Sequence, residues 1–173
     1  MQATGNDWAQ YLYFDDIYID STTSEVIPTI VPSYRFLLAS ADADGITTDW
    51  VGSDGNSVDN FEMVDDIPSD GGATYITTST GATLNAVTLD NESITGFDVV
   101  AVYPHAIVKA GVDATQELLI YVRDTVTGNF GRSLNQPVGS VYHPIFDERV
   151  TSINTLTWDQ TEIDNLQVGI ETA

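Results

Sequence analysis

The sequence predicts an all-β fold, an antiparallel β-sandwich or jelly roll with one short C-terminal helix. Segments rich in β-branched and aromatic residues recur along the 173-residue chain, and turn-forming residues separate them roughly every 8–12 positions. A helix start signal occurs at one place, near residue 157. Because no internal repeat or linker interrupts the pattern, we expect one domain over residues 11–173.

The stretch 58–81 shows the strand and turn pattern most clearly. It opens with an alternation that places Phe61 and Met63 on one face of a predicted strand. The turn cluster IPSDGG interrupts the pattern at 67–72. A second strand is predicted over 75–78, where Tyr, Ile and Thr suit a pleated, half-buried surface. We therefore expect two strands joined by an acidic loop.

The chain before this stretch is predicted to alternate between strands and loops. Residues 1–10 are polar and are expected to form a loose N-terminal arm. The segment YLYFDDIYID at 11–20 is a predicted strand with its Tyr and Ile side chains sharing one face. A second strand is predicted over 34–39, and the Asp-, Gly- and Thr-rich segment 42–56 is expected to be a loop around Trp50.

After residue 81 the sequence predicts four further strands before the helix. One of them, FDVVAVYPHAIVK at 97–109, is apolar on both faces and is therefore expected to be a buried central strand. The others cover shorter segments at 83–89, 117–123 and 140–146, and an extended segment is expected at 149–156.

The helix is predicted from a capping box at its start. Thr157 is expected to be the N-cap, and Gln160, three residues later, is expected to return a hydrogen bond. Ile163 and Leu166 are three positions apart, so both would face the core. A closing strand is predicted over 167–171.

Composition excludes several classes of protein. The chain has no cysteine, which excludes a disulfide scaffold, thiolate metal sites and a cysteine nucleophile. It contains no apolar run long enough to span a membrane, so we expect no membrane insertion. The first ten residues lack a basic region followed by an apolar core, so they do not predict a secretory signal.

The charge of the chain is strongly negative. There are 26 acidic residues against 5 basic ones, which gives a formal net charge of -21. A field of this sign repels nucleic acid, so DNA or RNA binding is not expected. Two interpretations remain open: an acidic surface that keeps the protein soluble, and adaptation of a halophilic protein to high salt, which screens the self-repulsion.

Signals of catalysis are few. His105 lies inside the strand that is expected to be buried, so we interpret it as a hydrogen-bonded core histidine, and His143 as structural. The sequence contains neither a Gly-x-Ser-x-Gly elbow nor a glycine-rich phosphate loop. Carboxylate pairs that could serve a glycosidase are expected by chance in so acidic a chain. We therefore predict that the protein is not an enzyme.

Calcium is the metal that the carboxylates would suit. Asp42 and Asp44, followed by Gly45, resemble the start of an oxygen-ligand loop, although the remaining ligands of an EF-hand are missing. A second set of candidate ligands surrounds the predicted turn and comprises Asp65, Asp66 and Asp70. The alternative for both sets is a solvated acidic surface with no bound metal and no cofactor.

The tryptophans also allow two interpretations. Trp8, Trp50 and Trp158 could be platforms on which sugars stack. The alternative is that each packs at the rim of the sandwich or at a subunit contact.

The order of segments resembles a family of small virion structural proteins of tailed double-stranded DNA viruses, which are associated with the capsid as decoration or with the tail. The similar segments are DDIYI at 15–19, TDW at 48–50 with Gly55, VDNF and VDDIP at 58–61 and 64–68 with Tyr75 and STG at 79–81, KAG at 109–111, and Trp158 with LQVG at 166–169. The chain departs from the family pattern at Asp66, where Glu is usual, and at residues 73–74, where acids are usual.

The resemblance implies a non-enzymatic role in the virion. It favours a decoration or cement protein on the capsid surface that contacts the major capsid protein and is made in the host cytoplasm. It also implies a homo-oligomer, with a trimer favoured, and Trp8, Tyr11 and Tyr13 are the expected aromatic anchors of the arm. The alternative is a tail, turret or fibre component whose sandwich domain binds a carbohydrate or the host.

Overall fold

The computed structural model of the protein describes residues 37–66, 68–70, 72–111, 116–154 and 157–173. All described helices and strands belong to the unit Leu38–Ala173. The predictions for the arm at 1–10, for the strand at 11–20 and for the anchors Trp8, Tyr11 and Tyr13 lie outside the described residues.

The main sheet is antiparallel and its central strands are the most buried. Within the described part of the chain its strand order is β1-β4-β10-β6-β7, and β8 pairs with the other end of β6. The bounds are Ala41–Thr48 for β1, Leu84–Leu89 for β4, Leu166–Thr172 for β10, Gln116–Asp124 for β6, Phe130–Arg132 for β7 and Gln136–Val138 for β8. Every strand pair that the structure describes is antiparallel.

Two shorter strand pairs and two helical segments complete the described fold. The bounds are Val51–Gly52 for β2 and Ile76–Thr77 for β3, which pair, and His105–Val108 for β5 and His143–Phe146 for β9, which also pair. A 3-10 helix, η1, covers Asn60–Met63, and the α-helix α1 covers Gln160–Asp164. The predicted all-β class with one short α-helix is therefore confirmed.

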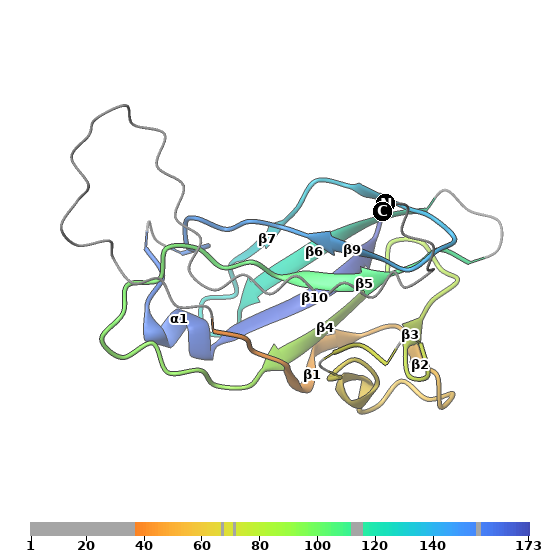
Figure 1. Cartoon of the computed structure of the whole chain (residues 1–173), viewed down its shortest axis with the longest axis horizontal. Helices are drawn as coiled ribbons and strands as arrows, with labels where there is room; N and C mark the ends of the chain where they lie inside the picture. Colours follow the sequence, from red (N-terminus) through yellow and green to blue (C-terminus); the bar gives the residue numbers. More distant parts are fainter. Residues whose placement is uncertain (1–36, 67, 71, 112–115, 155–156) are drawn as a thin grey trace, which may run out of the picture. The chain divides into compact units, whose positions relative to one another are not determined.

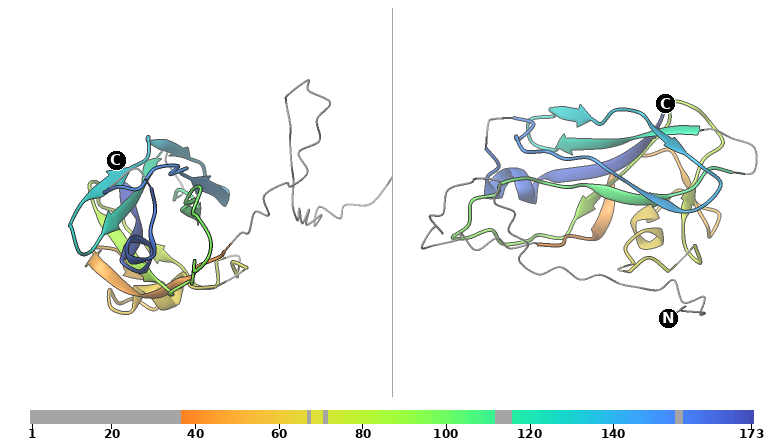
Figure 2. Two further views of the ribbon diagram at one scale, coloured as in Figure 1. Left: turned by 90° about the vertical axis from the view of Figure 1, so that its left-hand side faces the viewer. Right: turned by 45° about the horizontal axis from the view of Figure 1, so that its top comes forward.

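The core lies on the face of the main sheet that β5 and β9 cover. Figure 1 shows this pair lying over β10 and β6, and the end-on view in Figure 2 shows it across from the main sheet. Ile120 of β6 and Ile145 of β9 are fully buried in one cluster, together with Trp50. Full burial of an aliphatic side chain of this size stabilises the fold by about 1.5–3 kcal/mol.

Several predicted strands are confirmed. The predictions at 83–89, 117–123 and 167–171 correspond to β4, β6 and β10, and the shorter β9 and β3 lie within the predictions at 140–146 and 75–78. Leu166 is buried at the start of β10, and Ile163 packs against the same cluster, as expected from their spacing. The strands β7 and β8 were not predicted, because three residues carry too little alternation to be recognised.

The predicted loop at 42–56 is wrong, because this segment contains β1 and β2. β1 pairs with β4 at the edge of the sheet, where much of its length is solvent-exposed and polar residues are tolerated. The predicted strand at 34–39 is also wrong over its described residues, 37–39, since residues 37–40 precede β1 without forming a strand.

The predicted strand at the start of 58–81 is wrong as well, because Asn60–Met63 forms η1. Asp59 has a left-handed backbone conformation with φ of 57°, which breaks the extended chain. Asn60 is fully buried, and its Nδ2 donates to the Trp50 carbonyl (3.0 Å) and to Asn85 Oδ1 (2.8 Å). These bonds attach η1 to the sheet.

The predicted buried central strand at 97–109 is the largest error. Only His105–Val108 forms a strand, and that strand belongs to a two-stranded pair while β10 and β6 occupy the centre of the main sheet. The extended segment predicted at 149–156 contains one isolated bridge, between Arg149 and Val102.

The predicted capping box of Thr157 and Gln160 is wrong, because a different box starts the helix two residues later. The N-cap is Asp159, whose carboxylate accepts from the Glu162 N–H at 2.9 Å, and Glu162 Oε2 accepts from the Asp159 N–H at 3.3 Å. Asp caps helices at least as well as Thr, and only this register places a Glu at the third helical position. Thr157 and Gln160 therefore do not form the box.

Candidate functional site

Two extended segments form a ribbon that is longer than β5 and β9 themselves. Within β5 and β9, His105 lies opposite Phe146 and Val108 lies opposite His143. The pairing continues beyond the strands, since Val102 and Arg149 exchange two backbone hydrogen bonds of 2.9 and 2.8 Å. We call residues 99–108 and 143–150 the ribbon.

The ribbon has one face in the core and one face in solvent. Ala106, Val108 and Ile145 point into the core cluster. Besides His105, Pro144 and Glu148, the solvent-exposed positions carry large apolar side chains, which we call the ribbon face: Val100, Tyr103, Ile107, Phe146 and Val150, exposed by 63, 54, 45, 64 and 58%. Large exposed apolar patches on soluble proteins mark interaction sites. The segment 97–109 was therefore predicted wrongly because several of its apolar residues are exposed, and an apolar sequence alone does not show whether a residue is buried.

Each carboxylate of the ribbon has a partner within the ribbon. Its two acidic residues are Asp147 and Glu148. Asp147 forms an ion pair with Arg149 at 2.5 Å, and Glu148 accepts a hydrogen bond from the Tyr103 hydroxyl at 2.7 Å. That hydrogen bond, with smaller contributions from desolvation and the charge of Glu148, raises the pKa of Tyr103. The ribbon face is thus an apolar area on a strongly acidic protein.

His105 does not lie in the core, and that prediction is wrong. The side chain is exposed, because the alternation along β5 turns it outward with Tyr103 and Ile107. His143 is half-buried, and its Nδ1 and Nε2 lie 3.1 and 3.3 Å from the carbonyl oxygens of Val141 and Pro137. This arrangement agrees with the structural role expected for His143.

The candidate calcium ligands are distributed over separate elements. Asp42 and Asp44 lie on β1, and Asp44 Oδ1 accepts from the Phe61 N–H at 3.0 Å. Asp65 and Asp66 follow η1, and Asp70 lies within the predicted turn at 67–72. Among the described residues, no three Asp, Glu, His or Cys side chains come together in a way that could hold a metal ion.

Asp70 instead organises its own loop. Its carboxylate accepts from the backbone N–H groups of Gly72 (2.9 Å), Ala73 (3.1 Å) and Thr74 (2.7 Å), and from the Thr74 hydroxyl (2.8 Å). The Thr74 hydroxyl also lies 3.1 Å from Asp66 Oδ2, so this hydroxyl brings two of the candidate carboxylates together. The hydrogen bond from the Thr74 hydroxyl, followed by that from Gly72, lowers the pKa of Asp70.

Two of the three tryptophans are buried, so they cannot be sugar platforms. Trp50 is 8% exposed and Trp158 is 5% exposed, and they belong to different core clusters. The Trp158 Nε1–H donates to the Arg149 carbonyl at 3.0 Å. The packing alternative holds for both, within the core rather than at its rim, and Trp8 lies outside the described residues.

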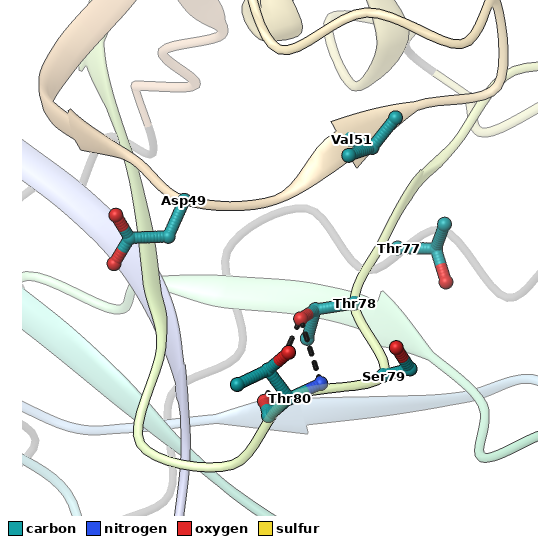
Figure 3. A pocket seen from close by; sticks show the side chains of 6 residues that line it. All are labelled: Asp49, Val51, Thr77, Thr78, Ser79 and Thr80. Carbon is teal, nitrogen blue, oxygen red and sulfur yellow. Dashed lines mark hydrogen bonds between the residues drawn. The ribbon is translucent and has the colours of Figure 1, made fainter.

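A shallow hollow of about 290 Å³ lies between β2 and the segment after β3 (Figure 3). Polar and apolar groups line it in equal measure, and the lining residues are Asp49, Val51, Thr77, Thr78, Ser79 and Thr80. Thr78 Oγ1 accepts from the Thr80 N–H at 3.1 Å, which fixes the turn at its edge. The hydroxyl-rich run TTST was the available signal for this hollow, and sequence reasoning missed it. The hydroxyl groups and the Asp49 carboxylate can form hydrogen bonds with a polar ligand.

Comparison with family models, with curated proteins and with solved structures finds no match to this chain. In the part of the chain that the structure describes, no helix is sufficiently long and apolar to cross a membrane.

Proposed function

We propose that the protein is a non-enzymatic structural protein of a tailed-virus virion, and more specifically a decoration or cement protein that contacts the major capsid protein. We assign its fold to the β-sandwich or jelly-roll type, because the ribbon packs on the core face of the main sheet. The observation that carries the functional proposal is the ribbon face, an exposed apolar area on a chain with a net charge of -21. The segment-by-segment resemblance to virion proteins supports the same proposal.

The ribbon face has the composition of a protein contact. Aromatic residues near the centre of an interface contribute most of its binding energy, and Tyr103 and Phe146 occupy the middle of the ribbon. Apolar area removed from water contributes roughly 25 cal/mol per Å². The acidic remainder of the surface repels other copies and keeps the protein soluble before assembly.

The proposal includes a homo-oligomer, with a trimer favoured, on the capsid surface. In this proposal the N-terminal arm at 1–10, with Trp8, and the residues Tyr11 and Tyr13 that follow it supply a second contact. Two contacts on one protein raise the occupancy of a repeating lattice without either contact being strong.

The test is to place a charge on the ribbon face and measure attachment to capsids. We expect Phe146→Asp to bind empty capsids of the parent virus at least tenfold more weakly, a loss of about 1.4 kcal/mol. The matched control is Val126→Asp, which adds the same charge at a position that is 70% exposed in the turn between β6 and β7. Equal binding by Phe146→Asp and the wild type would contradict the proposed contact surface.

A tail, turret or fibre component that binds a carbohydrate is the second candidate, and the hollow beside Asp49 favours it. Hydroxyl groups with one carboxylate are suited to hydrogen bonding with a sugar. If this candidate is correct, host surface polysaccharide should bind the wild type and Phe146→Asp equally. Asp49→Asn should bind it more weakly. Capsid binding that depends on Phe146, without polysaccharide binding, would exclude this candidate.

A further inference from the structure

The outer edge of β5 offers a row of unpaired backbone groups. Val102 and Arg149 exchange both of their hydrogen bonds, and the Pro104 carbonyl accepts from the Asp147 N–H at 3.0 Å. In an antiparallel ladder the backbone groups of successive residues point to opposite sides. The N–H and C=O groups of Tyr103, His105 and Ile107 therefore point away from β9, and no strand of the described residues pairs with them.

The opposite edge of the ribbon is protected. On β9 the alternation turns Pro144 and Phe146 outward, and Pro144 has no N–H to donate. The Phe146 carbonyl already accepts from Gln136 Nε2 of β8 at 2.9 Å. Both features block the addition of a strand, as natural edges usually do.

The edges of the main sheet are protected too. β1 has two register irregularities along its pairing with β4. Its Asp44 carboxylate accepts from η1, which lies against it. β7, at the other edge, is three residues long. Bulges, covering elements and short strands each prevent edge pairing, so β5 carries the most complete unprotected edge of the described sheets.

We propose that this edge pairs with the same edge of a second copy, antiparallel and across a two-fold axis. The free edge runs from Tyr103 to Ile107, so its midpoint is His105. His105 then lies opposite His105 of the second copy, and Tyr103 lies opposite Ile107 of the second copy on both sides of the axis. Because three residues of each copy face the other, the pairing forms about six backbone hydrogen bonds. It joins two ribbons into one four-stranded sheet.

Charge limits where a second copy can bind, and this edge meets that limit. Two copies of a chain with a net charge of -21 repel each other over most of their surfaces. At this edge no carboxylate lies among the paired residues, and Glu148, opposite Tyr103 on the ribbon, is hydrogen bonded to Tyr103 within its own copy. Tyr and Ile in opposite positions also form a favourable cross-strand pair. The two-fold contact does not depend on the proposed function, and it differs from the trimer favoured there because it joins copies in pairs. It would place two ribbon faces side by side.

An edge contact is small compared with the roughly 800 Å² per partner of a stable interface. Association is therefore weak in dilute solution, so disulfide cross-linking is the appropriate way to measure the contact. The chain has no cysteine, so each introduced thiol reports one position. Opposite residues of antiparallel strands lie about 5.5 Å apart at a hydrogen-bonded pair, within the range that a disulfide spans.

The experiment compares single-cysteine variants of the full-length chain under mild oxidation in molar KCl, with covalent dimers measured on non-reducing gels. His105→Cys should form dimers at least tenfold faster than the control Val126→Cys, which lies in the β6–β7 turn. When each is oxidised alone, Tyr103→Cys and Ile107→Cys should form covalent dimers at the control rate. Mixed together, with one carrying a tag, they should form the heterodimer at the rate of His105→Cys.

These outcomes separate the alternatives. If residues 1–36 or a different protein occupied the edge, the thiols of two His105→Cys copies would stay apart, and dimerisation at the control rate would overturn the proposal. Rapid self-crosslinking of Tyr103→Cys would overturn the register. Wild-type melting temperatures for the variants, in the presence of reductant, show that the exposed substitutions leave the fold intact.

Discussion

At the scale of single residues, Asp70 shows how an acidic side chain can stabilise a loop instead of binding a metal. Its two carboxylate oxygens accept four hydrogen bonds from residues 72–74. Gly72 has a φ of 98°, a conformation that favours glycine, and a Cβ at this position would collide with the Tyr142 ring. The turn predicted at 67–72 is therefore held by one carboxylate and one glycine.

We predict that Asp70→Asn lowers the melting temperature at neutral pH and that the difference disappears in acid. The native loop lowers the pKa of Asp70 below its ordinary value of 3.8. A group whose pKa is lowered by folding contributes stability above its unfolded pKa, and this contribution is lost as the pH falls through the folded pKa. Thermal melts at pH 7 and at about pH 2 measure both ends of that window.

The matched control for this substitution is Asp65→Asn, which removes the same charge. Asp65 is exposed, and its carboxylate is not among the groups that hold the Asp70 loop. Equal melting temperatures for the two variants at neutral pH would show that net charge, and not the loop, accounts for the effect.

At the scale of elements, the close packing of β10 against β4 depends on the absence of a side chain. Gly169 lies opposite Ala86 of β4 and Tyr121 of β6. A Cβ on Gly169 would overlap the backbone of Asn85 and Ala86. Because these atoms belong to a paired central strand, they cannot move aside without disturbing the ladder.

We predict that Gly169→Ala destabilises the protein by roughly 1–3 kcal/mol, the usual cost of an overpacked site. Gly139→Ala is the matched control, since nothing lies within 4 Å of a Cβ built at that glycine. Urea unfolding of both variants measures the difference. If Gly169→Ala were as stable as Gly139→Ala, the prediction would be wrong, because β4 and β10 could then move apart to admit the added Cβ.

The elements also show what the sequence could predict and what it could not. β4, β6 and β10 were predicted because their Val, Ile, Leu and Tyr residues suit buried strands. β1, with the sequence ADADGITT, was missed because it is stabilised by pairing with β4 and not by its own propensity. The segment 97–109 was predicted to be buried on both faces because a local apolar pattern does not show which of its residues the rest of the fold leaves exposed. The helix was found, but its start was predicted from Thr157 and Gln160, whereas Asp159 and Glu162 form the capping box.

At the scale of the whole molecule, the balance between a moderate core and a large negative charge determines stability. The described residues form two ion pairs between charged side chains, Arg132 with Glu171 and Arg149 with Asp147. Most carboxylates therefore lack a cationic partner, since 26 acidic residues share 5 basic ones. Their mutual repulsion opposes folding.

We predict that the melting temperature rises continuously as KCl is increased from dilute buffer to molar concentration. The Debye length falls from about 10 Å at 0.1 M salt to about 3 Å at 1 M, so repulsion between separated carboxylates is largely screened. Thermal melts across a KCl series measure the effect, and a neutral osmolyte serves as the control. A melting temperature that is flat or falls with salt would contradict this expectation.

The free edge of β5 has a consequence for how far assembly can proceed. A strand that pairs with a different strand of its neighbour leaves one edge open at every step, so growth continues into a fibre. A strand that pairs with itself across a two-fold axis uses the same edge in both copies, and the outer strands of the resulting sheet are the β9 strands, which Pro144 and Gln136 protect. Growth then stops at two ribbons. The same arrangement that attracts a second copy makes the protein resistant to aggregation once the pair has formed.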